Sequence, residues 1–148
     1  MDPRRVPVAL AALFDSEQLG TLYALLDALV PPDDFPGAVG AGVPDYLAGQ
    51  LRDELASCVS TYAAGLDGLS GEAQNRFGTG FASLSPHQQE RLLLEVEAGR
   101  VCTTWATDPQ RFFTTVLEHT MEGFYADPGN GGNRHAVSWR MIGFEVTG

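Results

Sequence analysis

Histidine and glutamate stand at helical spacing in one segment, where the chemistry they would suit is metal binding. His119 follows Glu118 directly and precedes Glu122 by three residues, so one Glu-His pair would share a helix face. A di-iron site in a helical bundle needs a second such pair from another helix, and the sequence contains none. His87 and His135 lie far from this segment. We therefore predict no metal site and interpret the three histidines as surface or hydrogen-bonded residues.

The sequence also lacks the patterns that covalent and acid–base catalysis require. No serine lies in a Gly-x-Ser-x-Gly nucleophile elbow. The neighbouring carboxylates at 33–34 and at 95 and 97 are interpreted as solvated charges. All nine basic residues are arginines, which excludes Schiff-base and P-loop lysine chemistry. We predict that this chain has no catalytic residue.

A glycine-rich segment, GNGGNR at residues 129–134, raises the question of a phosphate-binding loop. A dinucleotide-binding fingerprint follows a strand, whereas the pattern before this segment predicts a helix. Gly129, Gly131 and Gly132 instead permit a tight turn with positive φ, which lets the last part of the chain fold back. We therefore predict that this chain binds no cofactor.

Aromatic side chains and arginines are concentrated after this turn, and these are the types enriched in protein interfaces. They include Trp139 and Arg140.

Cys58 and Cys102 are the only cysteines of the chain. Two distant cysteines cannot staple a scaffold, so buried free thiols are expected, with a single disulfide as the alternative in an exported protein.

Composition limits the partners that the chain can have. Its 148 residues are enough for one domain with its own core, and 44% of them are hydrophobic. The formal net charge of −10 disfavours nucleic acid and anionic membranes. No stretch approaches the roughly 20 apolar residues that span a bilayer.

The elements that would position these residues are predicted to be helical. We expect an all-α, single compact domain of five to six helices, with a Pro/Gly-rich loop at 30–44 and a Gly/Asn-rich C-terminal turn. Apolar spacing and capping patterns predict helices at 15–30, 44–69, 71–77 (capped by Ser70), 86–98, 108–126 and 134–143. Residues 1–14 are expected to form an N-terminal arm, with an extended conformation as one option, and without a cleaved signal.

Three segments together resemble one known family. The segment LEHTMEGFYADPGNGGNRHAVSWRMIGF, residues 117–144, closely resembles the C-terminal signature of the gluconate 2-dehydrogenase subunit 3 family. LYALLDALVPPDDFPGAVGAGVPDYL at 22–47 and FASLSPHQQERLLLEVEAG at 81–99 are similar to its N-terminal and middle parts. The resemblance spans nearly the whole chain.

The resemblance implies a non-catalytic small subunit that binds and stabilises a large catalytic subunit of the glucose-methanol-choline oxidoreductase type. FAD is then expected in the partner and not in this chain, and the heteromeric complex would oxidise a sugar, glycoside or polyol. A cytochrome c subunit or another acceptor would take the electrons. Two alternatives stay open: a maturation chaperone or export escort for the flavoprotein, and an independent helical domain with a pocket formed by His119, Glu122 and His135.

The aromatic and arginine side chains of the C-terminal motif, taken together with the resemblance, lead us to place the partner interface there. We expect Asp127, Asn133 and Arg134 to fix the turn, while other residues form or support the contact surface. The candidate interface residues are Tyr125, Asp127, Asn133, Arg134, Trp139, Arg140 and Phe144. A role for each of them in this chain's own fold alone is the alternative. The absence of a clear signal sequence favours the cytoplasm, and family habit favours the periplasm or cell envelope.

Overall fold

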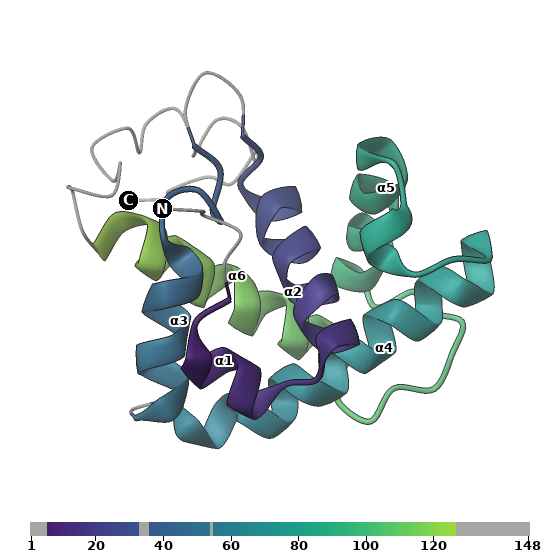
Figure 1. Cartoon of the computed structure of the whole chain (residues 1–148). Helices are drawn as coiled ribbons and strands as arrows, with labels where there is room; N and C mark the ends of the chain where they lie inside the picture. The colour runs from purple at the N-terminus through teal and green to yellow at the C-terminus, as the bar shows by residue number, and fades with distance from the viewer. Residues whose placement is uncertain (1–5, 33–35, 54, 127–148) are drawn as a thin grey trace, which may run out of the picture.

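The computed structural model describes residues 6–32, 36–53 and 55–126. Over these ranges the regular secondary structure is all helical, with no strand, which confirms the predicted all-α class (Figure 1). The elements are α1 (Val8–Leu13), α2 (Ser16–Leu29), α3 (Val43–Arg52), the 3-10 helix η1 (Ala56–Cys58), α4 (Val59–Phe77), the 3-10 helix η2 (Phe81–Ser83), α5 (Pro86–Glu97) and α6 (Pro109–Ala126).

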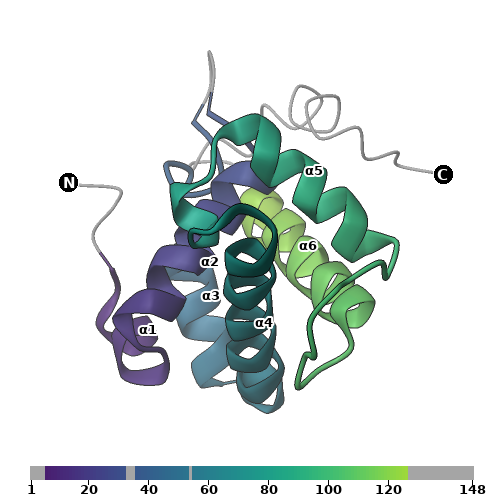
Figure 2. The same ribbon diagram turned by 90° about the vertical axis from the view of Figure 1, so that its right-hand side faces the viewer.

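α2, α3, α4 and α6 surround the core, and α1 and α5 pack at its sides. α2 and α3 both contact α6, α2 also packs on α4, and α4 lies along α6. α1 packs against α3, while α5 packs against α6 at the other side of the molecule (Figures 1 and 2). The C-terminal end of α6 is therefore held between elements from the first half of the chain.

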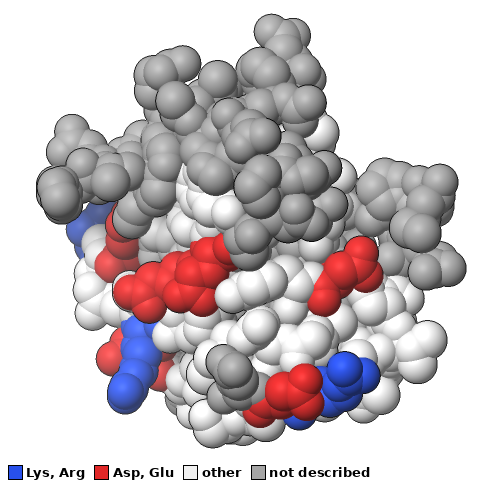
Figure 3. All heavy atoms as spheres, turned by 90° about the vertical axis from the view of Figure 1, so that its left-hand side faces the viewer, with Lys and Arg blue, Asp and Glu red and all other residues white. Residues whose placement is uncertain are grey.

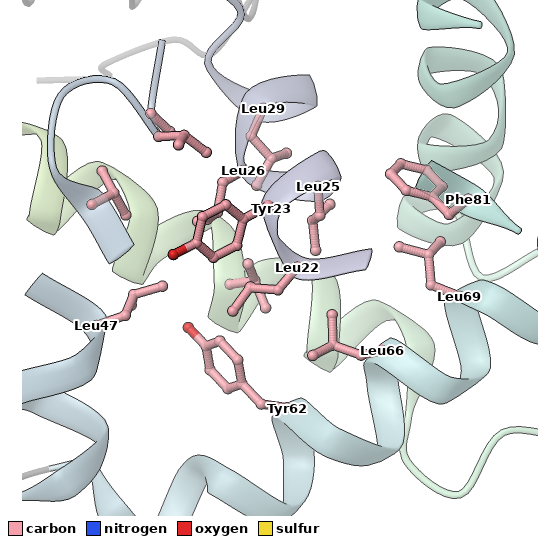
Figure 4. Close-up of a cluster of buried hydrophobic side chains, with 14 of the residues drawn as sticks. Leu22, Tyr23, Leu25, Leu26, Leu29, Leu47, Tyr62, Leu66, Leu69 and Phe81 are labelled. Atoms are coloured by element: carbon pink, nitrogen blue, oxygen red, sulfur yellow. The ribbon is translucent and has the colours of Figure 1, made fainter. Parts of the chain in front are cut away.

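Every α-helix contributes to the buried core, and one part of it is formed by leucines of α2 and the facing side of α4. Leu22 and Leu26 are fully buried, and Leu66 and Leu69 lie opposite them (Figure 4). Tyr62 points from α4 into the same space and is also fully buried. The 3.6-residue apolar period of these segments thus marks the faces that pack together.

Two predicted helix starts are confirmed at the level of single hydrogen bonds. Asp15 caps α2, because its side chain accepts from the backbone N–H of Gln18 at 2.7 Å while the Gln18 side chain accepts from the Asp15 N–H. Ser85 and Gln88 form the same reciprocal box at the start of α5. Such boxes satisfy N–H groups that no helix carbonyl reaches.

One long helix predicted over 44–69 is wrong, because the chain breaks between α3 and α4. Asp53 has φ −113° and ψ −94°, outside the helical region, and the N–H of Leu55 bonds the carbonyl of Gln50 at 2.6 Å. Regular leucine spacing continues through this turn since both helices bury their leucines in the same core. The spacing fixes the buried side of each segment but not the continuity of the backbone.

A separate helix capped by Ser70 is also wrong, because α4 runs without interruption to Phe77. Ser70 is buried within the helix rather than exposed at a helix start. The predicted break after this segment is confirmed: Gly78 ends α4 with φ 79°, a conformation that glycine adopts without a Cβ clash.

An extended form was one option for residues 1–14, and within the described part of that segment, residues 6–14, the chain is instead largely helical. α1 forms over Val8–Leu13, with Pro7 at its N-cap position, and its Ala-rich sequence favours a helix. Leu10 and Phe14 are buried in the main core, so α1 gains stability from packing against α3.

None of the helices within the described ranges is long and apolar enough to cross a membrane. Acidic side chains are more widespread than arginines on the face that carries α3 (Figure 3). This agrees with the net charge of −10.

Candidate docking site at the end of α6

The candidate docking site begins at the C-terminal half of α6, where that helix meets α3 and α4. Tyr125 is half-buried there, and its ring lies edge-on to Phe124 with a centroid separation of 5.5 Å. The other predicted interface residues lie outside the described residues: Asp127, Asn133, Arg134, Trp139, Arg140 and Phe144. The described part of the site is therefore the C-terminal half of α6 together with the residues of α3 and α4 that it contacts, and we call this part the platform.

His119 fixes the inner side of this platform. Its ring stacks on Tyr62 with an interplanar angle of 6° and a centroid separation of 5.7 Å. Nδ1 of His119 lies 2.8 Å from the Tyr62 hydroxyl, within hydrogen-bonding distance. Since His119 is only 8% exposed and Tyr62 is fully buried, this is a core contact between α6 and α4. It confirms that His119 is hydrogen-bonded.

Burial keeps both members of this pair neutral near pH 7. Burial lowers the pKa of His119, while the charges of Glu122 and Glu118 oppose that shift. Burial raises the pKa of Tyr62, and the charges of Cys58, Glu122 and Tyr46 add to that effect. A pair of neutral groups in a low-dielectric core is suited to positioning a helix rather than to transferring protons.

The outer side of the platform is the close contact between α6 and α3. A Cβ atom at Gly123 would lie 2.7 Å from Cδ2 of Tyr46, so glycine is what allows these helices to approach. The Tyr46 hydroxyl donates a hydrogen bond of 3.3 Å to Glu122 one residue earlier. Gly123 belongs to the segment 117–144 that resembles the family signature, and in the structure it allows α6 to pack closely against α3.

The Pro/Gly-rich loop is packed against α2 where the structure describes it. Asp27 of α2 accepts a hydrogen bond of 3.1 Å from the N–H of Val39, and the N–H of Ala38 bonds the Val30 carbonyl at 3.0 Å. Ala38 and Val39 are buried. Gly42 then has φ 94° and starts α3. The loop thereby sets the position of the α3 helix against which α6 ends.

The residues of the alternative pocket do not converge where they are described. His119 faces Tyr62 in the core, whereas Glu122 is exposed and bonded to Tyr46; His135 is outside the described ranges. No group of three or more His, Cys, Asp or Glu residues in the described segments is arranged to hold a metal ion.

A second buried polar cluster was missed by sequence reasoning. Glu72 of α4 is fully buried and accepts hydrogen bonds from the connection between α5 and α6: the N–H groups of Cys102 (2.6 Å) and Thr103 (3.2 Å) and Nε1 of Trp105 (3.2 Å). Arg76 adds an ion pair at 2.8 Å. The signal in the sequence is a charged residue on the buried face of α4, between Leu69 and Ala73.

These hydrogen bonds determine the protonation state of the Glu72 carboxyl. Burial alone would raise its pKa, but hydrogen bonds from Thr103, Cys102, Arg76 and Trp105 outweigh burial and lower the pKa to about 2. The group is therefore ionised at neutral pH and has partners on both oxygens.

The cysteines are both free thiols, in agreement with the first of the two expectations. Their predicted burial is only partly right, since Cys58 is half-buried and Cys102 is exposed. The backbone N–H of Cys102 is held by Glu72, while its side chain is directed to the surface.

Comparison with protein families identifies the family of the chain. The family model for gluconate 2-dehydrogenase subunit 3 matches residues 16–147, so the match includes α2 to α6 and the whole predicted docking segment. The chain belongs to the gluconate 2-dehydrogenase subunit 3 family. No curated protein and no solved structure gave a significant match to the chain.

Proposed function

We propose that this chain is the non-catalytic small subunit of an FAD-dependent sugar, glycoside or polyol dehydrogenase complex. It binds and stabilises the large flavin-carrying subunit of the glucose-methanol-choline oxidoreductase type. FAD and the reacting groups lie in that partner, and a cytochrome c subunit or another acceptor receives the electrons.

Membership of the gluconate 2-dehydrogenase subunit 3 family is the observation that carries this proposal. The polar groups of the described core support it. His119 and Tyr62 are neutral and bonded to each other, and Glu72 is fully occupied by its own chain. Both clusters hold helices and a connection of the domain in place.

The proposal is tested by co-expressing the chain with its large flavin subunit and separating the product by size exclusion while recording flavin absorbance. A stoichiometric peak, together with loss of soluble or active flavoprotein when this chain is omitted, is the expected result. A flavoprotein that is fully active alone, with this chain eluting separately, would overturn it. Release of the chain after the flavoprotein matures would instead indicate a maturation chaperone or export escort.

The predicted interface is tested in the same assay. Arg140→Ala and Trp139→Ala are expected to weaken the complex. Arg91→Ala removes the same side-chain type from the exposed side of α5 and is the matched control for Arg140. Equal behaviour of Arg140→Ala and Arg91→Ala would show that Arg140 is not part of the interface.

A further inference from the structure

An open groove with a volume of about 440 Å³ follows the outer side of α2. Ser16, Leu19, Gly20, Tyr23 and Ala24 of α2 line it, and two other segments close its sides with Val6, which precedes α1, and Ala82 of η2. In Figure 1, α2 lies between α1 and α5. Three separate parts of the chain thus contribute one uncharged surface.

α1 follows shortly after the lining residue Val6. Val8 lies two residues after Val6 and is 85% exposed, the most exposed large hydrophobic side chain of the described residues. The sequence of α1, VALAAL, contains no polar residue at all. An apolar surface made of a groove and an adjoining helix is typical of a protein-docking site rather than of a small-molecule pocket, which is enclosed and has convergent polar groups.

The charges near the groove define the chemistry of its occupant. Glu17 is exposed in the first turn of α2, next to the lining residue Ser16, and α2 has no basic residue; Asp15 and Asp27 add negative charge to the helix, although each already accepts a backbone hydrogen bond. The arginines of the described ranges belong to α3, α4, α6 and the α5 region. An occupant that is apolar in its centre and carries arginine or lysine at its flanks is therefore complementary to this surface, whereas an acidic one is repelled.

We propose that this groove binds an apolar segment of the large flavin subunit whose flanks carry arginine or lysine. This inference rests on the proposed function, and it adds a contact region formed by α2, Val6 and Ala82 to the one predicted at the C-terminal motif. The bound segment lies over Gly20, where the absence of a side chain exposes the α2 backbone to close approach.

A pair of matched glycines gives a direct test. Gly20 and Gly71 are both exposed within helices, and a Cβ added at either one would meet no atom within 4 Å. Gly20→Glu places a bulky negative charge in the groove, while Gly71→Glu places the same charge on the exposed side of α4. Both variants are expected to fold, which far-UV circular dichroism and thermal melting of the chain check.

The measurement is the dissociation constant of each variant with the large flavin subunit, by titration of purified components. We expect Gly20→Glu to weaken the complex by at least about tenfold, roughly the effect of one unpaired charge at an interface, and Gly71→Glu to bind like the wild type. Glu17→Arg should weaken binding more at low salt than at high salt, because it reverses the charge beside the groove.

Several results would overturn the inference. If the wild type binds and Gly20→Glu binds equally well, the groove is not the docking site and the proposed function still stands. If Gly20→Glu instead abolishes a self-association of the chain measured by light scattering without the large subunit, the occupant is a second copy. If the wild type itself does not bind the large subunit, it is the proposed function that fails.

Discussion

His119 and Tyr62 are 57 positions apart in the chain, yet their rings stack almost in parallel and their polar atoms lie 2.8 Å apart. This contact connects the C-terminal half of α6 to the middle of α4. Tyr125 lies in α6 and the other predicted docking residues follow this helix, so the pair helps to fix the point from which that segment starts.

Removing the Tyr62 hydroxyl should destabilise the domain. In Tyr62→Phe the buried Nδ1 of His119 loses its partner, which we expect to reduce the free energy of unfolding by roughly 1–3 kcal/mol. Urea denaturation followed by circular dichroism measures this change. Tyr46→Phe is the control, since it removes a hydroxyl that bonds an exposed carboxylate of Glu122, where water replaces it. Equal losses in the two variants would show that burial of the His119 pair is unimportant.

The stability of the domain should fall at mildly acidic pH because of His119. Its pKa is lowered in the folded state, so between the folded pKa and the unfolded value of about 6.5 only the unfolded chain binds the proton. This contribution to stability is complete above about pH 6.5 and decreases as the pH falls below it. Unfolding free energies measured between pH 7.5 and 5 should show this slope in the wild type and in His87→Gln, whose side chain is exposed, but not in His119→Gln. An unchanged slope in His119→Gln would assign it to other groups.

Replacing Glu72 should loosen the connection between α5 and α6. Glu72→Gln puts an amide donor among groups that all donate and leaves Arg76 without its buried partner, so we expect a loss of roughly 3–5 kcal/mol. Limited proteolysis should then cut between residues 98 and 108. Glu90→Gln, at an exposed site of α5, should leave both readouts unchanged. An intact connection in Glu72→Gln would mean that the hydrogen bonds do not hold it.

Protonation of the Glu72 carboxylate should cause a second loss of stability, at a more acidic pH than that of His119. The folded pKa of Glu72, about 2, lies below the unfolded value, so its contribution is present above about pH 4.5 and is lost as the pH falls toward 2. An acid titration that follows Trp105 fluorescence would detect the release of the indole from Glu72. No change in the transition on Glu72→Gln would contradict the assignment.

Two glycines of α4 should respond in opposite directions to the same substitution. A Cβ at Gly65 would lie 1.9 Å from the ring of Phe112, whereas a Cβ at Gly71 would meet no atom within 4 Å. Gly65→Ala should therefore destabilise the domain by about 1–3 kcal/mol through overpacking, and Gly71→Ala should stabilise it by up to ~1 kcal/mol through helix propensity. Thermal melting of both variants checks the signs, and a stabilising Gly65→Ala would show that Phe112 moves freely.

Local patterns in the sequence predicted the local features of the fold. The caps at Asp15 and Ser85 depend on residues three apart, and Gly99 ends α5 with φ 78° as its position in the sequence indicates. The turn at Asp53 was not visible, because it needs no special residue when the surrounding leucines can be buried by either a bent or a continuous helix. Ser70 was misassigned since a serine inside a helix and a serine cap look alike without the tertiary packing.

The candidate site was less accessible to prediction for the same reason. His119 was recognised as a hydrogen-bonded residue, but its partner Tyr62 belongs to another helix and only the folded core brings them together. The position of Glu72, a charged residue among buried ones, was visible in the sequence. Its partners were not, because they belong to the distant segment 102–105. Of the predicted docking residues, Tyr125 is the one that the structure describes.

The connection between α5 and α6 binds the Glu72 carboxylate in the way that a receptor binds an anion, and this affects the order in which the domain assembles. Backbone N–H groups and an indole surround the carboxylate much as a receptor surrounds a free carboxylate ligand, but here the ligand is covalently part of α4. Its high effective concentration replaces the affinity that a diffusing anion would need. The connection should therefore become ordered as soon as α4 is formed, before α5 has docked, so that amide exchange at Cys102 and Thr103 follows the stability of α4 rather than that of its own neighbours in sequence.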